Sequence, residues 1–322
     1  MPLTSSVTEF RDGAGLVVTV VAVLGVTIAT GFGGVISLGH GVFVATGAFG
    51  TAIAVNDLKL SWIGAVVLGA AIAGVLGALV ALPMLRIRGI YLALVTLGLA
   101  MSFQPVVKRF PALTGGVGGR GVDLEVLPAS WLGTSRWAVV CYRYLICIAA
   151  VAVVLWLTHN LVNSRAGRAM RAVRDNETAA AVYGVNIVST RVATFAVSAA
   201  VSGFAGALGV VLVPYVSQES YPPQESLLLY ALAVLGGLHS VWGAVAAVAI
   251  REVAEVLGAQ LARVDGLGPL SEFFDLLADE RFLFALALVA LTLLFPHGLT
   301  GSGSQGARRS GGRHRGSRLL RD

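Results

Sequence analysis

One polar segment of this 322-residue chain, residues 163–188, combines several charged side chains with helix-capping residues. Its arginines Arg165, Arg168 and Arg171 recur every three residues, a spacing that makes them neighbours on a helix surface. Ser164 stands just before them and is a good helix cap, because its hydroxyl can accept a free backbone N–H. The pattern predicts a short helix with a charged face. A solvated basic connector is the alternative interpretation.

A second short helix is expected directly after the first, from about Asn176 to Tyr183. It would end at Gly184, because glycine readily adopts the left-handed conformation that stops helices. Two short helices in one loop would form a compact surface with a charged face and a small apolar face. This surface lies between two strongly apolar stretches of the chain.

A glycine-serine pattern occurs twice, as GGVISL at residues 33–38 and as GGLHSV at residues 236–241. Each copy interrupts a hydrophobic stretch. Paired interruptions of this kind in the two halves of a chain point to a transporter built from inverted repeats, with its binding site at the broken helices. The ends of broken helices offer backbone N–H and C=O groups to a solute's charges. The predicted substrate path consists of Gly33, Gly34, Ser37, Gly39, Gly236, Gly237 and Ser240.

Catalytic motifs are missing from the sequence. Neither of the two lysines, Lys59 and Lys108, follows a glycine, so the chain has no GxxxxGK[ST] phosphate loop. No histidine is followed by glutamate, which excludes the HExxH zinc motif, and Cys141 and Cys147 both lie in an apolar run. His40, beside the first glycine break, is expected to be a packing residue. We therefore expect no catalytic residue, no metal site and no cofactor bound by this chain.

The composition determines where such a chain can fold. It is 56% hydrophobic and only 12% charged, with a mean hydropathy of +0.82, whereas soluble domains carry about 25% charged residues. The chain is therefore expected to lie in a lipid bilayer. Its net charge of +6 does not indicate nucleic-acid binding, because basic residues at the ends of membrane spans normally report topology.

Uncharged stretches predict an all-α fold, a polytopic transmembrane helix bundle of about nine spans, with a weak inverted repeat and broken helices. The predicted transmembrane domain covers residues 1–300. Residues 301–322, rich in Gly, Ser and Arg, are expected to form a disordered basic cytoplasmic tail. The nine expected spans are 14–31, 42–55, 62–84, 89–105, 137–159, 189–213, 227–239, 242–262 and 282–296.

Basic residues also predict the orientation. With the N-terminus outside, the inside segments 85–88 and 160–188 and the tail from 297 hold more than half of the 23 Lys and Arg residues. Inside loops carry this excess in most membrane proteins. The sequence thus predicts a multi-pass protein with an outside N-terminus and a cytoplasmic C-terminus.

The segment 167–180, GRAMRAVRDNETAA, followed by GVN at 184–186, resembles the coupling loop of the branched-chain amino acid ABC importer permeases, in particular the LivM-type subunit. The similarity extends over roughly residues 15 to 300. Family members usually carry one more hydrophobic span before the region equivalent to residues 15–30, where this chain has only a polar stretch. The other agreeing blocks are ISLGHG at 36–41, RGIY at 88–91, LGG at 235–237 with WG at 242–243, and LFPHGL at 294–299.

The resemblance implies a permease subunit of the bacterial inner membrane that works by alternating access. It further implies a second, LivH-like permease subunit, two cytoplasmic ATPases that hold ATP and Mg²⁺, and an extracytoplasmic solute-binding protein. The residues that would contact the ATPases are Arg168, Arg171, Ala172, Asn176, Glu177, Ala179, Ala180 and Gly184.

Two other functions remain open from the sequence. A permease for simple sugars or nucleosides of the same superfamily would share the loop pattern. A membrane sensor or enzyme would need a cluster of catalytic residues within the spans, and the sequence shows none.

Overall fold

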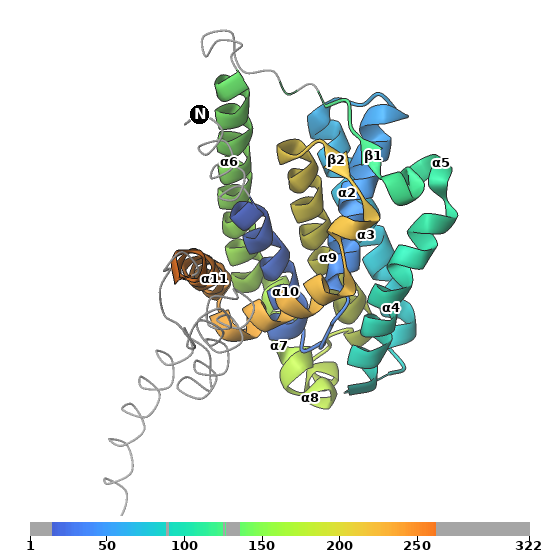
Figure 1. The fold of residues 1–322 in the computed structure, drawn as a ribbon. Coiled ribbons are helices and arrows are strands. Elements are labelled where there is room, and N and C mark those ends of the chain that lie inside the picture. The colour runs from blue at the N-terminus through green and yellow to red at the C-terminus, as the bar shows by residue number, and fades with distance from the viewer. Residues whose placement is uncertain (1–14, 88–89, 125, 127–135, 262–322) are drawn as a thin grey trace, which may run out of the picture. The chain divides into compact units, whose positions relative to one another are not determined.

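A computed structural model describes residues 15–87, 90–124, 126 and 136–261. In this part of the chain the fold is all-α, apart from one two-stranded ribbon (Figure 1). The first helix, Gly15–Phe32, ends in a π-helical turn, Thr27–Phe32. The other elements are α2 (His40–Asn56), α3 (Trp62–Met84), α4 (Ile90–Arg109), α5 (Pro111–Thr114), β1 (Arg120–Gly121), α6 (Arg136–Asn163), α7 (Arg165–Asp175), α8 (Glu177–Val182), α9 (Ile187–Leu212), β2 (Tyr215–Val216), α10 (Pro223–Gly236) and α11 (Val241–Leu261).

Five of the described helices are long and apolar enough to cross a membrane. They are Gly15–Phe32, Trp62–Met84, Tyr91–Arg109, Ala138–Asn163 and Ile187–Leu212, each close to a predicted span. Helices α10 and α11 meet the same criterion only as a broken pair, and α2 is a shorter apolar helix. The expected span 282–296 and the expected tail 301–322 lie outside the described residues.

Helices α2, α3 and α9 pack together through glycines. A β-carbon on Gly47 of α2 would lie 1.9 Å from the carbonyl oxygen of Gly203 on α9. One on Gly206 would lie 1.8 Å from the carbonyl oxygen of Val44. Small residues permit this close backbone approach, which drives helix association where lipid removes the hydrophobic driving force. The small-residue face of α9 is therefore an interface.

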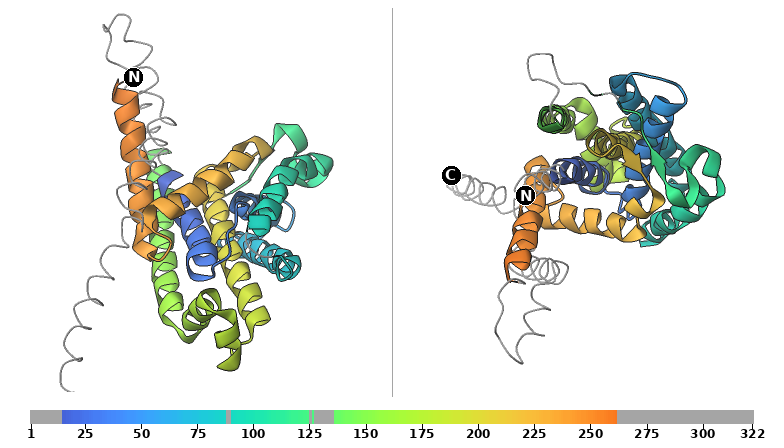
Figure 2. Two further views of the ribbon diagram at one scale, coloured as in Figure 1. Left: turned by 90° about the horizontal axis from the view of Figure 1, so that it is seen from below. Right: turned by 45° about the horizontal axis from the view of Figure 1, so that its top comes forward.

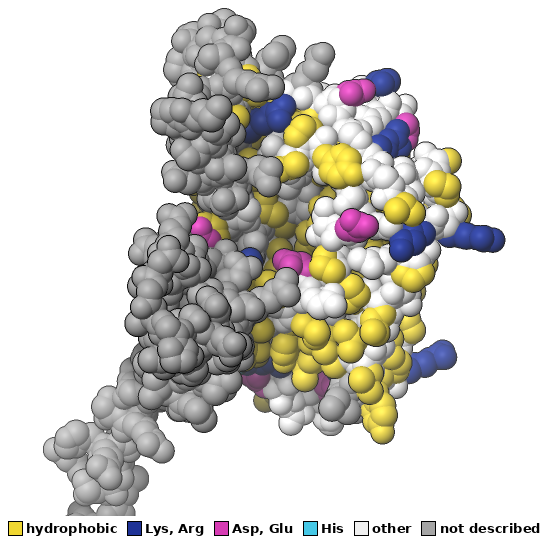
Figure 3. Space-filling view, viewed as in Figure 1, with side chains coloured by type: hydrophobic (Ala, Val, Ile, Leu, Met, Phe, Trp, Pro, Cys, Tyr) yellow, Lys and Arg dark blue, Asp and Glu magenta, His cyan; other side chains and the backbone are white. Residues whose placement is uncertain are grey.

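The opposite faces of the helices expose apolar side chains. Along α3, Ile63, Val67, Val75 and Leu79 are all exposed and recur at about helical spacing. Figure 3 shows that hydrophobic side chains cover much of the described surface in that view, with few charged ones among them. Such a surface is suited to contact with lipid rather than water.

The helix pair α7 and α8 and the β1–β2 ribbon lie at opposite ends of α9. The 26 residues of α9 span about 40 Å. Helices α7 and α8 lie where α6 ends and α9 begins, and the β1–β2 ribbon lies at the far end (Figures 1 and 2). The strands are antiparallel, with Arg120 opposite Val216.

The glycine-rich segment before β1 is ordered by hydrogen bonds. Arg120 pairs with Asp57 and donates to the carbonyl of Leu113 at 2.9 Å. Tyr215 donates its hydroxyl to the carbonyl of Gly118 at 2.5 Å. Together these contacts tie the loop to the C-terminal end of α2 and to β2.

Contacts among α-carbons divide the chain into two compact units, one ending at Ala233 and the other beginning at Val234. The first unit contains every described element up to most of α10. The second contains the last turn of α10 and α11.

Candidate functional site

The segment predicted to contact a partner folds as two short helices. Ser164 caps α7 and accepts a hydrogen bond from the backbone N–H of Gly167 at 3.4 Å. Gly167, Met170 and Val173 form its buried face, because they lie three residues apart. The predicted first helix and its cap are confirmed.

The second predicted helix is α8. Asn176 caps it by accepting a hydrogen bond from the backbone N–H of Ala179 at 2.9 Å. Gly184 has a φ of +82°, the left-handed conformation expected of a helix stop. Both boundaries of this helix therefore follow from the residue types that the sequence places there.

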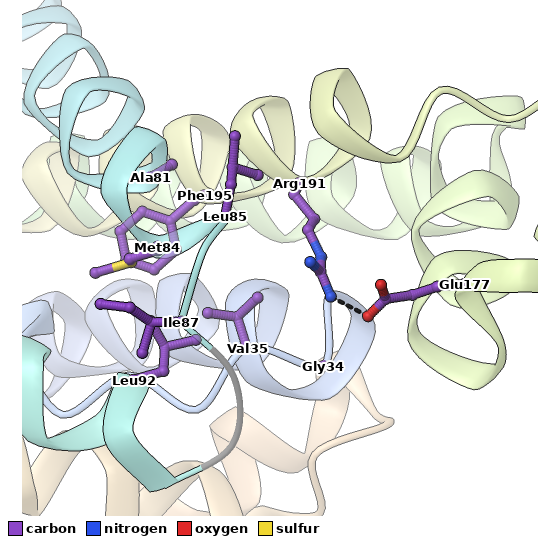
Figure 4. A pocket seen from close by; sticks show the side chains of 10 residues that line it. All are labelled: Gly34, Val35, Ala81, Met84, Leu85, Ile87, Leu92, Glu177, Arg191 and Phe195. Atoms are coloured by element: carbon purple, nitrogen blue, oxygen red, sulfur yellow. Dashed lines mark hydrogen bonds and ion pairs between the residues drawn. The ribbon is translucent and has the colours of Figure 1, made fainter. Parts of the chain in front are cut away.

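Two charged contacts fasten this helix pair to the membrane helices. Arg174, near the end of α7, donates to the carbonyl oxygen of Gly31 at 2.5 Å. A β-carbon on Gly34 would lie 2.5 Å from the Cγ atom of Arg174, so the arginine packs directly on the first glycine break. Glu177 of α8 forms an ion pair with Arg191 of α9 (Figure 4). The segment is thus attached both to the first broken helix and to α9.

The predicted coupling residues differ in their exposure. Arg168, Asn176, Ala179 and Gly184 are exposed, whereas Arg171, Ala172 and Glu177 are half-buried. Ala180, only 4% exposed, packs inside the chain and does not offer its side chain at the surface.

Two exposed apolar residues of this segment were missed by sequence reasoning. Val182 is 81% exposed and Tyr183 is 88% exposed, although both are large and apolar. Their signal in the sequence is an apolar pair placed directly before a helix-stopping glycine in a polar loop. Exposed side chains of this kind at a protein surface are typical of a docking site for another protein.

The first predicted substrate-path segment is a helix break at residues 33–39. Its backbone leaves the π-helical turn at Gly34, whose φ is +70°. The N–H groups of Gly33, Gly34 and Val35 donate back to carbonyls of the turn at 3.0 to 3.2 Å. These three donors are therefore already used within the chain.

A buried histidine joins the break to α9. His40 shares one hydrogen bond with Ser37 at 2.9 Å and another with Ser198 at 2.6 Å. Its ring also makes edge contacts with Phe43 and Phe195. The expectation that His40 is a packing residue is confirmed, and Ser37 is buried with it.

Helices α4 and α10 close the remaining sides of the break. The Leu38 N–H donates to the hydroxyl of Thr96 at 2.9 Å, and the Gly41 N–H donates to the hydroxyl of Ser226 at 3.0 Å. A β-carbon on Gly39 would lie 2.5 Å from the carbonyl oxygen of Thr96. Irregular backbone is tolerated at membrane depth when it is enclosed by protein in this way.

The second predicted segment is also a helix break. Gly237 has a φ of +95°, so in both copies the second glycine of the pattern is left-handed. Ser240 accepts a hydrogen bond from the backbone N–H of Gly243 at 3.2 Å and so caps α11. Gly236 and Gly243 face each other, since a β-carbon on either would lie 2.1 Å from the other's carbonyl oxygen.

Among the described residues, no group of three or more His, Cys, Asp or Glu side chains is placed to hold a metal ion. Arg143, an unusual charge inside an apolar helix, donates to the carbonyl oxygen of Leu124 at 3.3 Å. The sequence predicts a partner or an interfacial position for this arginine, because a charge within a span is costly.

The sequence of this chain is similar to a known protein family. A family model described as "Branched-chain amino acid transport system / permease component" matches residues 15–296. The high-affinity branched-chain amino acid transport system permease protein LivM of Salmonella typhimurium is 29% identical over 253 residues, which are 73% of this chain and 60% of the relative. LivM of Escherichia coli is 29% identical over 257 residues, with the same shares.

A LivH protein is similar over more of its own length. The high-affinity branched-chain amino acid transport system permease protein LivH of Salmonella typhimurium is 26% identical over 300 residues, covering 86% of this chain and 89% of the relative. The chain spans about three fifths of the length of the LivM proteins it matches. No solved structure matches the chain.

Proposed function

We propose, on the premise that the chain belongs to the family of branched-chain amino acid transport permeases, that it is a membrane-spanning subunit of an ATP-driven importer of these amino acids. A LivH-like permease and two ATPases that hold ATP and Mg²⁺ complete the membrane complex. An extracytoplasmic solute-binding protein delivers the substrate. The similarity to both LivM and LivH relatives supports a pair of related permeases.

The observation that carries this proposal is the attachment of α7 and α8. A partner that pulls on these helices moves Arg174, which holds the carbonyl of Gly31, and Glu177, which holds Arg191. Both contacts lie on helices that enclose the first break. Nucleotide-driven motion of the segment would thereby shift the break between two packed arrangements, as alternating access requires.

The substrate path in this proposal passes the two glycine breaks, at 33–39 and 236–240. The matching left-handed conformations of Gly34 and Gly237 support it, because equivalent broken helices in two halves are the mark of a repeat-built transporter. In the first break several backbone donors already have partners. A solute there would meet the remaining groups once the break has moved.

Uptake of labelled leucine tests the function directly. Cells that lack the gene should lose high-affinity leucine uptake, and a plasmid copy should restore it, with ribose uptake unchanged throughout. Impaired ribose uptake with normal leucine uptake would reassign the chain to the sugar permeases. No change in either uptake would favour a membrane protein that is not a transporter.

Docking of the ATPases is tested by Val182→Asp. A buried carboxylate without a partner costs several kcal/mol, so we expect this variant to lose the ATPase subunits on purification. Val117→Asp is the matched control, because Val117 is 69% exposed at the other end of the helices. Equal retention of the ATPases by both variants would remove α8 from the interface.

A further inference from the structure

Beside the first break lies a cavity of about 170 Å³ that is lined mostly by apolar side chains. Its walls come from the end of α3, the start of α4, the break itself, α8 and α9 (Figure 4). One water needs about 10–15 Å³ of space measured in this way. The cavity therefore has room for a small organic molecule rather than for one or two waters.

The cavity has a charged end and an apolar end. Glu177 and Arg191 form an ion pair at one side, and Met84, Leu92 and Phe195 lie at the other (Figure 4). Both charged side chains are partly exposed, at 28% for Glu177 and 21% for Arg191. A mostly apolar cavity with a few fixed polar groups is typical of a site for a small ligand.

We infer that this cavity, which borders the first break at Gly34 and Val35, is a binding site for an apolar α-amino acid. The guanidinium of Arg191 matches an α-carboxylate, which arginine binds with two parallel hydrogen bonds. The carboxylate of Glu177 matches the α-ammonium group. A branched aliphatic side chain then extends toward Met84, Leu92 and Phe195 and removes apolar surface from water.

The expected effect of the site on transport rests on the proposed function. The cavity lies beside α8 and α9, and α8 belongs to the segment that an ATPase would move. A bound amino acid would bridge α8, α9 and the break at Gly34 and Val35. It would stabilise the arrangement in which these elements are packed together. Amino acid that accumulates on the coupling side would therefore slow further import, since a ligand shifts a population toward the state that binds it better.

Binding is measured on the purified permease complex without its solute-binding protein, using labelled L-leucine. We expect saturable binding that is competed poorly by 4-methylpentanoate, which lacks the ammonium group, and by leucinamide, which lacks the carboxylate. Arg191→Gln should weaken binding about tenfold or more, since a hydrogen bond to a charged group contributes about that much. Arg120→Gln is the matched control, because Arg120 forms an ion pair at the other end of the helices.

A second variant fills the cavity without removing a charge. Ile87 lines the cavity and is half-buried, so Ile87→Trp should abolish leucine binding while the complex still assembles. Ile63→Trp, on the exposed face of α3, is the matched control. Leucine binding that is unchanged in both Ile87→Trp and Arg191→Gln, or equal binding of all three small molecules, would overturn the inference.

Transport separates the inference from the proposed function. Proteoliposomes with ATP inside and the binding protein outside are prepared either empty or loaded with millimolar leucine, with mannitol for osmotic balance. Uptake into empty vesicles tests the proposed function alone. A severalfold lower rate in loaded vesicles, absent in Ile87→Trp, supports the amino-acid site. Equal rates in loaded and empty vesicles of the wild-type complex would overturn the site and leave the importer assignment intact.

Discussion

Arg174 joins the helix pair α7 and α8 to the first broken helix through its hydrogen bond to Gly31. Its loss should separate the two most directly. Arg174→Ala removes the donor to the Gly31 carbonyl, and one such charge-assisted bond corresponds to about a tenfold effect. We expect leucine uptake and leucine-stimulated ATP hydrolysis to fall to that extent at an unchanged amount of protein in the membrane. Arg165→Ala, on an exposed arginine of the same helix, is the control. Equal activity of the two variants would contradict the role of Arg174.

The charge at Arg174 could be predicted from the sequence, but its inward contact could not. The segment 163–188 shows arginines at helical spacing, and this pattern is the same whether a given arginine faces a partner or the chain itself. Gly31 lies 143 residues away in sequence, and a local sequence pattern cannot predict a contact over that separation. The same reason explains why Glu177 was expected to meet a partner's charge, whereas it pairs with Arg191.

The ion pair between Asp57 and Arg120, beside the β1–β2 ribbon, should make the free energy of unfolding depend on pH. The hydrogen bond from Arg120 lowers the pKa of Asp57 below its ordinary value of 3.8. A carboxyl whose pKa is lower in the folded state stabilises that state above its ordinary pKa, and the contribution is lost as the pH falls through the folded value. Asp57→Asn should therefore be slightly less stable than wild type at pH 6, and the difference should shrink as the pH falls below 3.8 and disappear below the folded pKa of Asp57. Chemical unfolding in detergent across this range measures the difference, and a gap that persists at low pH would refute it.

At the scale of the elements, the glycines between helices should be essential for packing. Gly203→Val on α9 would place new atoms against Ala73, whose Cβ lies 2.2 Å from the position of a new β-carbon. Overpacking of this kind costs about 1–3 kcal/mol or more. Gly98→Val on α4 is the matched control, because nothing lies within 4 Å of a β-carbon there. Unfolding in detergent should show a large loss of stability for the first variant only, and equal stabilities would argue against a close α3–α9 interface.

Long apolar stretches were predicted well because their signal is local. The predicted span 62–84 coincides with α3, and the expected helices at 163–188 begin and end at the capping residues Ser164, Asn176 and Gly184. The glycine-rich segment at 114–121, by contrast, is held by contacts that have no local signal in the sequence. Its order comes from Asp57 and Tyr215, both distant in sequence, so composition alone could not show it.

The two breaks were predictable in place and only partly in structure. A repeated GGxxS pattern in apolar sequence indicates where helices are interrupted, and both second glycines are left-handed. What encloses the first break could not be predicted, because its partners Thr96, Ser198 and Ser226 are common residue types on other helices. The sequence around a small polar residue in a span does not indicate which group it will hydrogen-bond.

At the scale of the whole molecule, the coupling proposal depends on which side of the membrane α7 and α8 face. Cysteine labelling tests this orientation. We start from a chain in which the free Cys141 and Cys147 are replaced by alanine. A single cysteine is then placed at Val117 or at Tyr183, both highly exposed. Val117 lies between α5 and β1 and Tyr183 directly follows α8, and Figure 1 shows these elements at opposite ends of the helices. A membrane-impermeant maleimide added to intact cells should label the first and not the second, since basic segments such as 163–188 stay inside. Lysed cells should label both. The reverse pattern in intact cells would place α7 and α8 outside, where no ATPase could reach them, and the coupling proposal would fail with the orientation.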